Sequence, residues 1–584
     1  MPTVDVARRV SDLERIKVWS EGLYQPVAAD LGRPDPDVSE DSAHVLKYHG
    51  IYLQDDRDVR RSRRESGLPR DYRFMLRVKL PCGRMTAEQY LACDALAGRF
   101  GQGRLRVTSR QGIEFHGVTK PNLRALVHDL DALSALSALG ASGDVVRNVV
   151  APPLADIDPQ YGSWGSALLT LAREISKRYV PRTRAYYDLW LDDSRAVLRA
   201  DGTVDLPRES TVAEDPIYGT AYLPRKFKIA LAAPFDNAVD ALTNDVALIA
   251  AAEDNVLQGY DVRVGGGRGF TPGTPATFPQ LAVPFAFVEM ESVLPLLDAI
   301  IGVFREHGDR ANRAHARIKY LVREWGLERF RGAVESRLGR SLAAPRGTSP
   351  QAQRHHLGWS GQTQPGLKCL GLWLEHGRIR DFPDGPQYAR ALRTIVAQFR
   401  PGVRFTPGNH VVLADIREAD VAGVNRLLED HGIPNPETIA PLRRFEMACP
   451  ALPFCSRARA EAERMMPGLM RALIKAGHGG DEVVIRVSGC ANGCARPRTA
   501  EIGLIGNGLG RYHVYVGGNS AGTRINELIA EHVALEKLPA GLAGLLRLWK
   551  NQRDGAEGFG DWVHRVGIAS LKTSEVMNCT MPPA

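Results

Sequence analysis

Four cysteines near the end of the chain have the residue type and spacing to hold a metal centre. They form two pairs, Cys449-x5-Cys455 and Cys490-x3-Cys494. Four thiolates suit either a tetrahedral zinc ion or an iron–sulfur cluster. Neither pair has the tight Cys-x2-Cys spacing that is common at zinc sites, and both lie among small, turn-forming residues that let backbone approach a bulky cluster. The pattern favours an iron–sulfur cluster, with zinc or unligated buried thiols as alternatives.

Composition limits the kind of protein that carries these cysteines. The chain has 584 residues, of which 44% are hydrophobic and 24% charged. These values exclude a disordered, collagenous or coiled-coil protein and predict several domains. The other cysteines are too few and too scattered for a disulfide scaffold: Cys82, Cys93, Cys369 and Cys579. No apolar run is long enough to span a membrane and the N-terminus has no signal-peptide core, so we expect a soluble cytoplasmic protein.

The net charge of +8 is mild for a chain of this length. A nucleic-acid binder would usually concentrate such an excess more strongly, whereas an acidic protein partner or anionic small ligands would explain it equally well. The basic run from Arg57 to Arg64 is expected to be a solvated arm or surface helix rather than a nucleic-acid patch.

The chain around these cysteines contains two pairs of similar segments. Residues 75–117 and 369–416 both read strand, Gly-Arg turn, helix, strand, turn, strand, and each is followed by another helix. A second echo relates 259–267 to 511–519, which are alternating strands that run into a glycine turn. Two echoes in the same order predict a tandem duplication. No Gly-x-Gly-x-x-Gly loop opens a helix and no Walker loop occurs, so we expect no dinucleotide held by the chain itself.

Several motifs together resemble one known family. Ala-Cys-Pro-Ala-Leu-Pro-Phe-Cys (448–455) and Ser-Gly-Cys-Ala-Asn-Gly-Cys-Ala-Arg (488–496) look like the signature of the sirohaem-dependent sulfite and nitrite reductases. Within that family the chain is most similar to the haemoprotein (beta) subunit of assimilatory sulfite reductase. The resemblance covers about residues 45–570 and includes, in the family's order, 49–58, 108–111, 147–149, 223–228 and 557–561.

The resemblance implies an α+β fold built as a tandem pseudo-twofold duplication of ferredoxin-like (sulfite reductase repeat) modules, with three domains that enclose the cofactors. The ranges that we expect are an N-terminal arm (1–65), a first ferredoxin-like repeat (66–140), a sirohaem and substrate domain (141–340), a linker (341–365), a second ferredoxin-like repeat (366–432), and a [4Fe–4S] cluster and sirohaem-ligating domain (433–584).

The resemblance also assigns the cofactors. In the family the four cysteines hold a [4Fe–4S] cluster and the last thiolate bridges to the sirohaem iron. The metal ligands here would be Cys449, Cys455, Cys490 and Cys494, with Cys494 as the bridge.

Four cations stand at the family's substrate-binding positions: Arg77, Arg147, Lys226 and Lys228. The substrate is an anion whose oxygens leave as water, so fixed positive charges both bind it and organise proton delivery. On a strand, Lys226 and Lys228 would point to one face and Phe227 to the other.

Sirohaem carries several carboxylates, so its pocket should be basic. Candidate cofactor-binding residues come from the strand–turn–strand segment that resembles the family's sirohaem-binding loop, and from residues flanking the Lys pair and the bridging cysteine: Arg106, Thr108, Arg110, His116, Arg225, Asn492, Gly493 and Arg496.

Three departures from the family pattern affect these expectations. Glu114 stands where Gln is common, so its carboxylate should be paired with an arginine or turned away from an anionic cofactor. Val150 and Ala151 stand where some ferredoxin-dependent members carry a cysteine joined to a tyrosine, so no crosslink is expected. The loop Thr406–His410 keeps the turn of Thr108–Gln111 but lacks its cations. One copy should therefore hold cofactor and the other serve mainly structure, with Asn409 its candidate cofactor contact.

The reaction that we expect is the six-electron reduction of sulfite to sulfide for sulfur assimilation. Electrons would come from an NADPH-dependent flavoprotein subunit or from ferredoxin, and residues 54–58 resemble the flavoprotein-partnered type. The alternatives are a ferredoxin-dependent nitrite reductase with the same cofactors, and a zinc-stabilised, basic nucleic-acid-binding protein.

Overall fold

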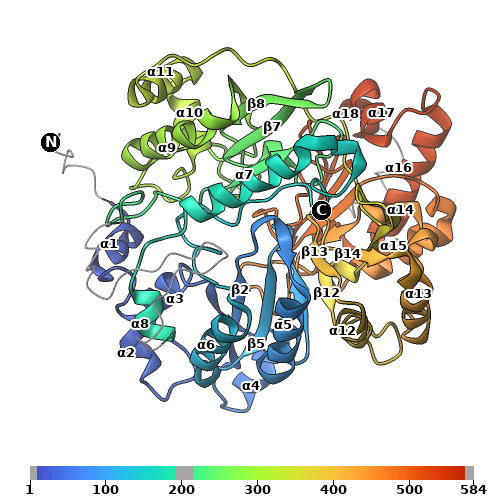
Figure 1. The fold of residues 1–584 in the computed structure, drawn as a ribbon. Helices are drawn as coiled ribbons and strands as arrows, with labels where there is room; N and C mark the ends of the chain where they lie inside the picture. The colour runs from blue at the N-terminus through green and yellow to red at the C-terminus, as the bar shows by residue number, and fades with distance from the viewer. Residues whose placement is uncertain (1–9, 192–214, 573–584) are drawn as a thin grey trace, which may run out of the picture.

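The computed structural model describes residues 10–191 and 215–572, so the start of the predicted N-terminal arm and Cys579 lie outside the described residues. Within these ranges the chain forms four β-sheets surrounded by helices (Figure 1). Two sheets belong to smaller ferredoxin-like halves and two to larger domains. Each helix in the described ranges is too short or too polar to cross a membrane.

The first ferredoxin-like half is an antiparallel sheet in the order β1-β2-β5-β4-β12, with α5 and α6 packed against each other. Helix α5 begins after Thr86, whose hydroxyl accepts the Gln89 N–H while the Gln89 side chain accepts the Thr86 N–H. This reciprocal cap fixes the start of the helix. The bounds are β1 (Ile51–Asp55), β2 (Tyr72–Val78), β4 (Leu105–Val107), β5 (Ile113–Val118), α5 (Ala87–Phe100) and α6 (Leu123–Ser134).

The second half repeats this arrangement as the sheet β10-β11-β14-β13-β3, with α12 and α13 packed together and α12 also against α5. The duplication predicted from the sequence is confirmed. Each sheet has five strands where its echo indicated three. The outer strands β1 and β10 come from the predicted arm and the predicted linker, and the fifth strand of each sheet comes from the other half. The bounds are β10 (Gly358–Gly361), β11 (Leu367–Leu372), β13 (Gly402–Phe405), β14 (Val411–Arg417), α12 (Tyr388–Phe399) and α13 (Val421–Asp430).

The two halves exchange a short strand. β3 (Arg84–Met85) leaves the first half to pair with β13, and β12 (Arg378–Ile379) leaves the second to pair with β4. A glycine precedes each exchanged strand with φ +72° at Gly83 and +78° at Gly377. A Cβ at Gly83 would lie 2.4 Å from the Phe405 carbonyl oxygen, and one at Gly377 2.6 Å from the Val107 oxygen. Only glycine tolerates both the backbone angle and the close approach.

Each larger domain has a sheet that is parallel on one side and antiparallel on the other. The first has the order β6-β7-β8-β9 and the second β15-β16-β17-β18-β19. The bounds are β6 (Ile229–Ala232), β7 (Val246–Glu253), β8 (Val256–Val264), β9 (Val283–Val288), β15 (Met447–Ala448), β16 (Ile485–Ser488), β17 (Ile502–Gly508), β18 (Arg511–Val516) and β19 (Glu527–Ala534).

Helices cover these sheets and the domain edges. α9 packs on β8 and on α10 and α11, and α16 packs on α15 and α17 (Figure 1). The helix bounds are α1 (Asp12–Trp19), α2 (Val27–Leu31), α3 (Glu40–Val45), α4 (Arg60–Glu65), α7 (Gly165–Arg178), α8 (Ala185–Trp190), α9 (Met290–His307), α10 (Ile318–Trp325), α11 (Leu327–Leu338), α14 (Pro441–Arg444), α15 (Met466–Leu473), α16 (Leu538–Gln552), α17 (Phe559–Val566) and α18 (Ile568–Lys572).

Two large hydrophobic cores and three smaller clusters lie within the described residues. One continuous core runs through both ferredoxin-like halves and the first large domain, and a separate core fills the second large domain from Leu442 to Leu571. The thiol-bearing domain is therefore packed as its own unit against the rest.

Candidate functional site

The two cysteine pairs lie at one edge of the second large sheet. Cys449 follows β15 and Cys490 follows β16, and these two strands are parallel. The carboxyl ends of parallel strands meet at the same edge, so the fold gathers both pairs there. The Gly489 N–H donates to Cys449 Sγ at 3.3 Å, which is the kind of backbone contact that supports a bound thiolate.

The four thiols are close enough to influence one another electrostatically. Burial, and after it the neighbouring Cys494, raises the pKa of the Cys490 thiol to about 11. Burial and Cys494 raise the pKa of Cys449 and of Cys455 in the same way. Such thiols are held neutral until a cation compensates their charge.

The donor set fits an iron–sulfur cluster, which takes one thiolate at each of four irons. Among residues 10–191 and 215–572, no three His, Cys, Asp or Glu side chains form a group that could hold a single metal ion. The thiolates of a four-iron cluster stand at its separate corners, so they need not converge on one point. Cys494 is exposed, whereas the other three thiols are half-buried.

The loop that carries Cys494 is held from several sides. The Ala495 N–H donates to the Ser488 hydroxyl at 3.0 Å, and the Ser109 hydroxyl donates to the Cys494 carbonyl at 3.2 Å. Arg268 Nη1 donates to the same carbonyl at 3.5 Å. The first half and the first large domain thus both reach the predicted bridging cysteine.

The predicted Lys pair lies just before β6 rather than inside a strand, because β6 begins at Ile229. Phe227 forms an isolated bridge with Val146, is fully buried and packs on Phe304, while Lys226 and Lys228 are half-buried. The alternation expected for these three residues is therefore present in an extended segment.

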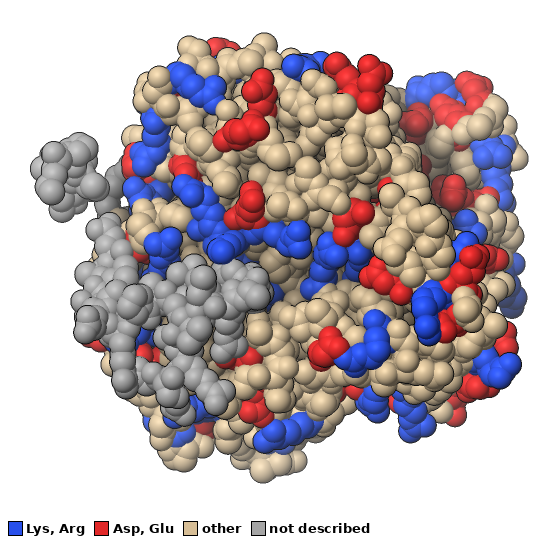
Figure 2. Space-filling model, viewed as in Figure 1, with Lys and Arg blue, Asp and Glu red and all other residues tan. Residues whose placement is uncertain are grey.

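Lys226 and Lys228 lie close to several arginines, so the charge around them is strongly positive. Burial first, and then Arg225 and Arg317, holds the pKa of Lys226 well below its usual range. Burial, followed by Arg268 and Lys226, does the same to the pKa of Lys228. Arg225 and Arg317 are paired with Asp144 and Asp245. Lys226 and Lys228 have no ion pair among the described residues, so these two lysines are suited to an incoming anion. Figure 2 shows Lys and Arg side chains in a band across the middle of the drawn face.

Part of the Arg77 guanidinium is bound by a carboxylate of the protein. Its Nε and Nη2 both donate to Glu114 Oε1, at 2.9 and 2.7 Å, and His116 Nε2 lies 3.1 Å from Glu114 Oε2. Burial alone would raise the pKa of Glu114, but Arg77 and His116 outweigh it and hold that pKa far below its usual range. The expectation that Glu114 pairs with an arginine is confirmed, and Arg77 keeps Nη1 for another partner.

Three of the predicted cofactor-binding arginines bind carboxylates of the protein. Arg106 pairs with Glu463, Arg496 Nη1 lies 2.9 Å from Asp240, and Arg225 Nη1 lies 3.5 Å from Asp144. Arg496 also donates to the carbonyls of Ala238 and Pro407, each at 2.7 Å. These three arginines therefore have structural partners, and a contact with cofactor stays a prediction for each.

Arg106 has a counterpart in the second half. Arg106 and Arg378 both bind Glu463, and at the equivalent place Arg404 and Arg84 both bind Asp156. In each half, one arginine comes from the exchanged strand and one from the strand it joins. The repetition indicates that these ion pairs secure the strand exchange.

The remaining predicted cofactor contacts form or flank turns. The Thr108 hydroxyl accepts the Gly112 N–H at 3.0 Å and so closes its own loop, while Arg110 Nη1 donates to Asn244 at 2.7 Å. Asn492 is exposed, and Gly493 is buried with φ +63°. Two buried polar atoms, Nε of Arg110 and Oδ1 of Asn409, have no hydrogen-bond partner among the described residues. They offer a donor and an acceptor to a bound group.

Sequence reasoning missed several residues of this site. Arg268 was passed over because the run Gly265–Gly267 predicted only a turn, yet that turn carries Arg268 to Cys494. The Ser109 hydroxyl donates to the Cys494 carbonyl, and this residue had no predicted role although it lies inside the motif 108–111. Tyr52 lies in another, and Arg77 stands over its ring with Cζ 5.2 Å from the centroid.

The basic run of the N-terminal region is mostly a solvated helix, α4, as expected, but its first member is not. Arg57 Nη1 donates to the Ala458 carbonyl at 2.6 Å and to the Cys455 carbonyl at 3.4 Å. This arginine thus supports the loop that carries the second cysteine.

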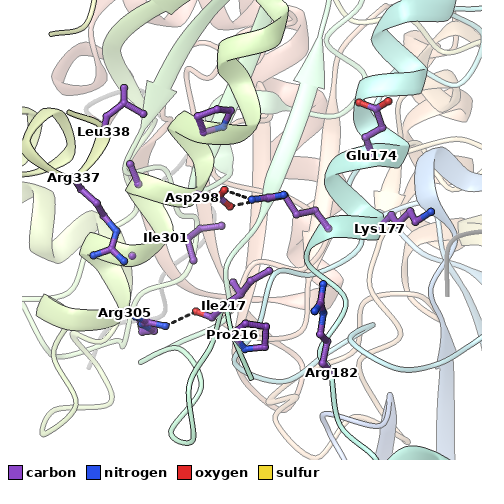
Figure 3. A pocket seen from close by; sticks show the side chains of 14 residues that line it. Glu174, Lys177, Arg182, Pro216, Ile217, Asp298, Ile301, Arg305, Arg337 and Leu338 are labelled. Carbon is purple, nitrogen blue, oxygen red and sulfur yellow. Dashed lines mark hydrogen bonds and ion pairs between the residues drawn. The ribbon is translucent and has the colours of Figure 1, made fainter. Parts of the chain in front are cut away.

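A separate cavity of about 770 Å³ lies beside α7 and α9 (Figure 3). Its lining includes Arg178 and Asp298, which pair with each other, and Arg305, which donates to the Ile217 carbonyl at 2.8 Å. None of the predicted metal ligands or substrate-binding cations lines it. This cavity is distinct from the candidate site.

Two family models match the chain. Residues 68–133 match the nitrite/sulfite reductase ferredoxin-like half domain, and residues 173–342 match the nitrite and sulphite reductase 4Fe-4S domain. The second range contains none of the chain's cysteines. The match therefore covers the first large domain, while the thiols lie in the second.

Curated relatives match nearly the whole chain. The sulfite reductase [ferredoxin] of Synechococcus elongatus is 38% identical over 97% of this chain and 91% of its own length. The sulfite reductase [NADPH] hemoprotein beta-component of Chromohalobacter salexigens is 39% identical over 95% of this chain and 95% of its own. The solved structure of the Mycobacterium tuberculosis NirA protein has the same fold, with a TM-score of 0.76 at 23% identity over 96% of this chain and 97% of that one.

Proposed function

The chain belongs to the nitrite and sulfite reductase family of oxidoreductases, and from that premise we propose that it reduces sulfite to sulfide with six electrons. The observation that carries the proposal is the meeting of four mutually interacting thiols with two lysines, Lys226 and Lys228, that have no ion pair among the described residues. Thiolates hold the redox cofactor, and the cations suit an oxyanion substrate.

When bound, a [4Fe–4S] cluster and a sirohaem would supply electrons one at a time and a metal at which an anion can bind. The residues proposed to hold these groups are Cys449, Cys455, Cys490 and Cys494. Arg110 and Asn409 contribute the unpartnered polar atoms described above.

The chain's own cations bind and orient the anion. Lys226 and Lys228 have pKa values pushed down by burial and by neighbouring arginines, so an arriving oxyanion would stabilise their charged forms. Charging on arrival places protons beside the oxygens that must leave as water. Arg147, whose N–H donates to the Phe227 carbonyl at 2.8 Å, and the remaining Nη1 of Arg77 in the first half would also hold the anion.

The electron donor is proposed to be an acidic protein that docks beside the cluster loop. Arg457 and Arg459 are exposed on that loop, and Arg57 lies against it. The relatives include a sulfite reductase [ferredoxin] and a sulfite reductase [NADPH] hemoprotein beta-component. Because residues 54–58 resemble the flavoprotein-partnered type, we propose the flavoprotein as the donor. Turnover with each donor at rising salt tests this, because screening weakens the docking of opposite charges. Turnover with reduced ferredoxin and none with the flavoprotein would reverse the choice.

The visible spectrum of the purified protein, with iron and acid-labile sulfide assayed on the same sample, tests the cofactor assignment. Haem bands with matching iron and sulfide are expected. A colourless protein that sirohaem supplementation during expression does not restore would contradict the assignment.

Comparison of kcat/KM for sulfite and nitrite tests the substrate. A preference for sulfite is expected, and a large preference for nitrite would replace this proposal with nitrite reduction. Both proposals place the reaction in the cytoplasm.

A further inference from the structure

Lys319, near the start of α10, is a buried lysine whose ammonium is held by backbone carbonyls. Its side chain belongs to a residue that is 1% exposed, which is rare for lysine. Its Nζ donates to the carbonyl of Gly269 at 2.9 Å, to that of Gly267 at 3.3 Å and to that of Phe278. An ammonium has three N–H donors, so one loop, residues 267–278, uses its whole capacity.

This loop packs against the Cys494 loop, residues 490–494. The Phe270 N–H donates to the Ala491 carbonyl at 3.4 Å, and the Phe270 side chain packs on the small hydrophobic cluster that contains Ala491. The contact continues at the next turn, where a Cβ added at Gly493 would lie 3.7 Å from the Cβ of Arg268. The two loops therefore touch through both backbone and side chains.

Arg268 lies between the two glycines whose carbonyls Lys319 binds. Because the ammonium holds the carbonyls of Gly267 and Gly269, the backbone is fixed on both sides of Arg268. Arg268 Nη1 then reaches the Cys494 carbonyl at 3.5 Å. Burial lowers the pKa of Arg268, and Cys494 is the largest influence that opposes burial. The guanidinium thus stands close to the proposed bridging thiolate.

A second cation of α10 fixes the start of the same loop. Arg317 Nη2 donates to the Gly266 carbonyl at 3.2 Å, and the same guanidinium binds Asp245. Asp245 also accepts the Lys228 N–H at 2.8 Å. The start of α10 therefore connects this loop to the segment that carries a proposed substrate-binding lysine.

We propose that Lys319 is a positioning residue for the cofactor site: through the loop 267–270 it holds Arg268 against the Cys494 loop. There the charge of Arg268 favours the more negative, reduced state of a cluster bound by the thiolates, since nearby hydrogen bonds and charges tune the potential of such a centre. The proposal rests on the cofactors assigned in the proposed function and deepens it. Lys319 acts through the loop, because the loop holds all three of its acceptors.

The test compares Lys319→Met with a matched control, Arg323→Met, in the purified holoenzyme. Arg323 lies one turn further along α10, is exposed, and faces the same Phe278 ring with Cζ 5.4 Å from the centroid. Both variants are expected to keep the iron, acid-labile sulfide and visible spectrum of the parent.

The reduction potential of the cluster is measured by redox titration followed by electron paramagnetic resonance. In Lys319→Met the potential should shift to more negative values, because Arg268 is no longer held beside Cys494. Electrons then enter the site less readily, and kcat for sulfite should fall about 10–100-fold, the usual effect of losing a residue that supports a metal ligand. Arg323→Met should match the parent in both potential and kcat.

Arg268→Met, alone and combined with Lys319→Met, separates positioning from packing. Arg268→Met should shift the potential in the same direction, since the charge itself is lost. The double variant should show the potential of Arg268→Met without a further shift, because the two residues act as one unit. Lys319→Gln, whose amide still donates to a carbonyl, should shift the potential less than Lys319→Met and serves as the test if Lys319→Met does not fold.

An unchanged potential in Arg268→Met or in the folded Lys319 variants, at full cofactor content, would overturn this inference and leave the proposed function standing. Additive shifts in the double variant would also overturn it, because Lys319 would then act by another route. A parent protein that holds the cluster but does not reduce sulfite would instead remove the proposed function, while the potentials would still decide the role of Lys319.

Discussion

The first large sheet and the second can be compared position by position, because the same shift along the chain relates Ile229 to Ile485 and Val246 to Ile502. In each sheet an acid just before one parallel strand holds the start of the parallel strand beside it. Asp245 accepts the Lys228 N–H at 2.8 Å, and Glu501 accepts the Val484 N–H at 2.9 Å.

The side chains at equivalent positions differ where the chemistry lies. The second copy carries Cys490 and Cys494, and the first has Pro234 and Ala238 at the equivalent places. The first copy carries Lys228 where the second has Val484. Backbone contacts that define the sheet are retained in both copies, so one copy can hold metal and the other substrate without a change of architecture.

One equivalent pair connects the copies directly. Asp240 of the first copy corresponds to Arg496 of the second, and the two form a buried ion pair at 2.9 Å. Arg486 joins the same carboxylate at 2.6 Å. The divergence of the copies thus produced the contact that fixes the Cys494 loop against the first domain.

The largest loss of activity is expected when the predicted bridging ligand, Cys494, is replaced. Cys494→Ser is expected to lose sirohaem or its coupling to the cluster and to reduce sulfite only at background rate, measured by visible spectrum and turnover. The matched variant Ala238→Cys alters the equivalent position of the first copy and should keep the parent spectrum. A fully active Cys494→Ser would refute the bridging role.

The next largest effect, a loss of stability, is expected when Glu463 or Asp156 loses one of its two arginines. Arg106→Met and Arg404→Met should each lower the free energy of unfolding by about 3–5 kcal/mol, because each leaves a largely buried carboxylate with one arginine fewer. Arg404 is 3% exposed and Arg106 9%. Denaturant unfolding of cofactor-free protein measures this. A loss of haem confined to Arg106→Met would instead support its predicted contact with cofactor.

Lys228 and Val484 stand at equivalent positions of the two copies, so variants at these positions test which copy binds substrate. Lys228→Ala should cut kcat/KM for sulfite about 10²–10³-fold while the spectrum is retained, because a fixed charge at the reacting anion is lost. Val484→Ala should leave kcat/KM unchanged and cost about 2 kcal/mol of stability through lost packing. Equal effects of the two variants on turnover would contradict the assignment of substrate binding to the first copy.

One of the two structural acids, Glu501, should make the stability of the protein depend on pH. Burial raises the pKa of Glu501 to about 7, above the value of about 4.3 in an unfolded chain. Between these values the folded state keeps a proton that the unfolded state has released, so stability falls as pH rises, by at most about 1.4 kcal/mol per pH unit.

Glu501→Gln should remove this decline, as measured by unfolding at about pH 5 and about pH 7. The other structural acid, Asp245, forms an ion pair with Arg317 at 2.8 Å. Asp245→Asn should destabilise the protein at both pH values, since a buried guanidinium loses its counter-charge. A pH slope that survives in Glu501→Gln would assign the titration to another group.

Much of the fold was predictable because the repeated pattern of strands, turns and helices is local. The exchanged strands were not, because two residues such as Arg84–Met85 carry no periodicity and their pairing depends on contacts more than three hundred residues away in the chain. The outer strand of the second half could not be predicted for a similar reason, because β10, Gly358–Gly361, has too few apolar residues to indicate a strand.

Within the site, residue types were predictable and their partners were not. Arg106 and Arg496 were expected near cofactor carboxylates because they are basic and lie in the right motifs. The structure gives them Glu463 and Asp240, which are distant in sequence. Arg268 was missed because its place near Cys494 depends on how two domains meet, which a single sequence does not reveal.

The exchange of β3 and β12 has a consequence for synthesis on the ribosome. The first half emerges early, but the outer edge of β4 stays open until Arg378–Ile379 has been made. An open strand edge pairs readily with other chains. The nascent first half must therefore wait for the second before its sheet is closed, and a fragment that ends before β12 should associate with copies of itself rather than persist as a free unit.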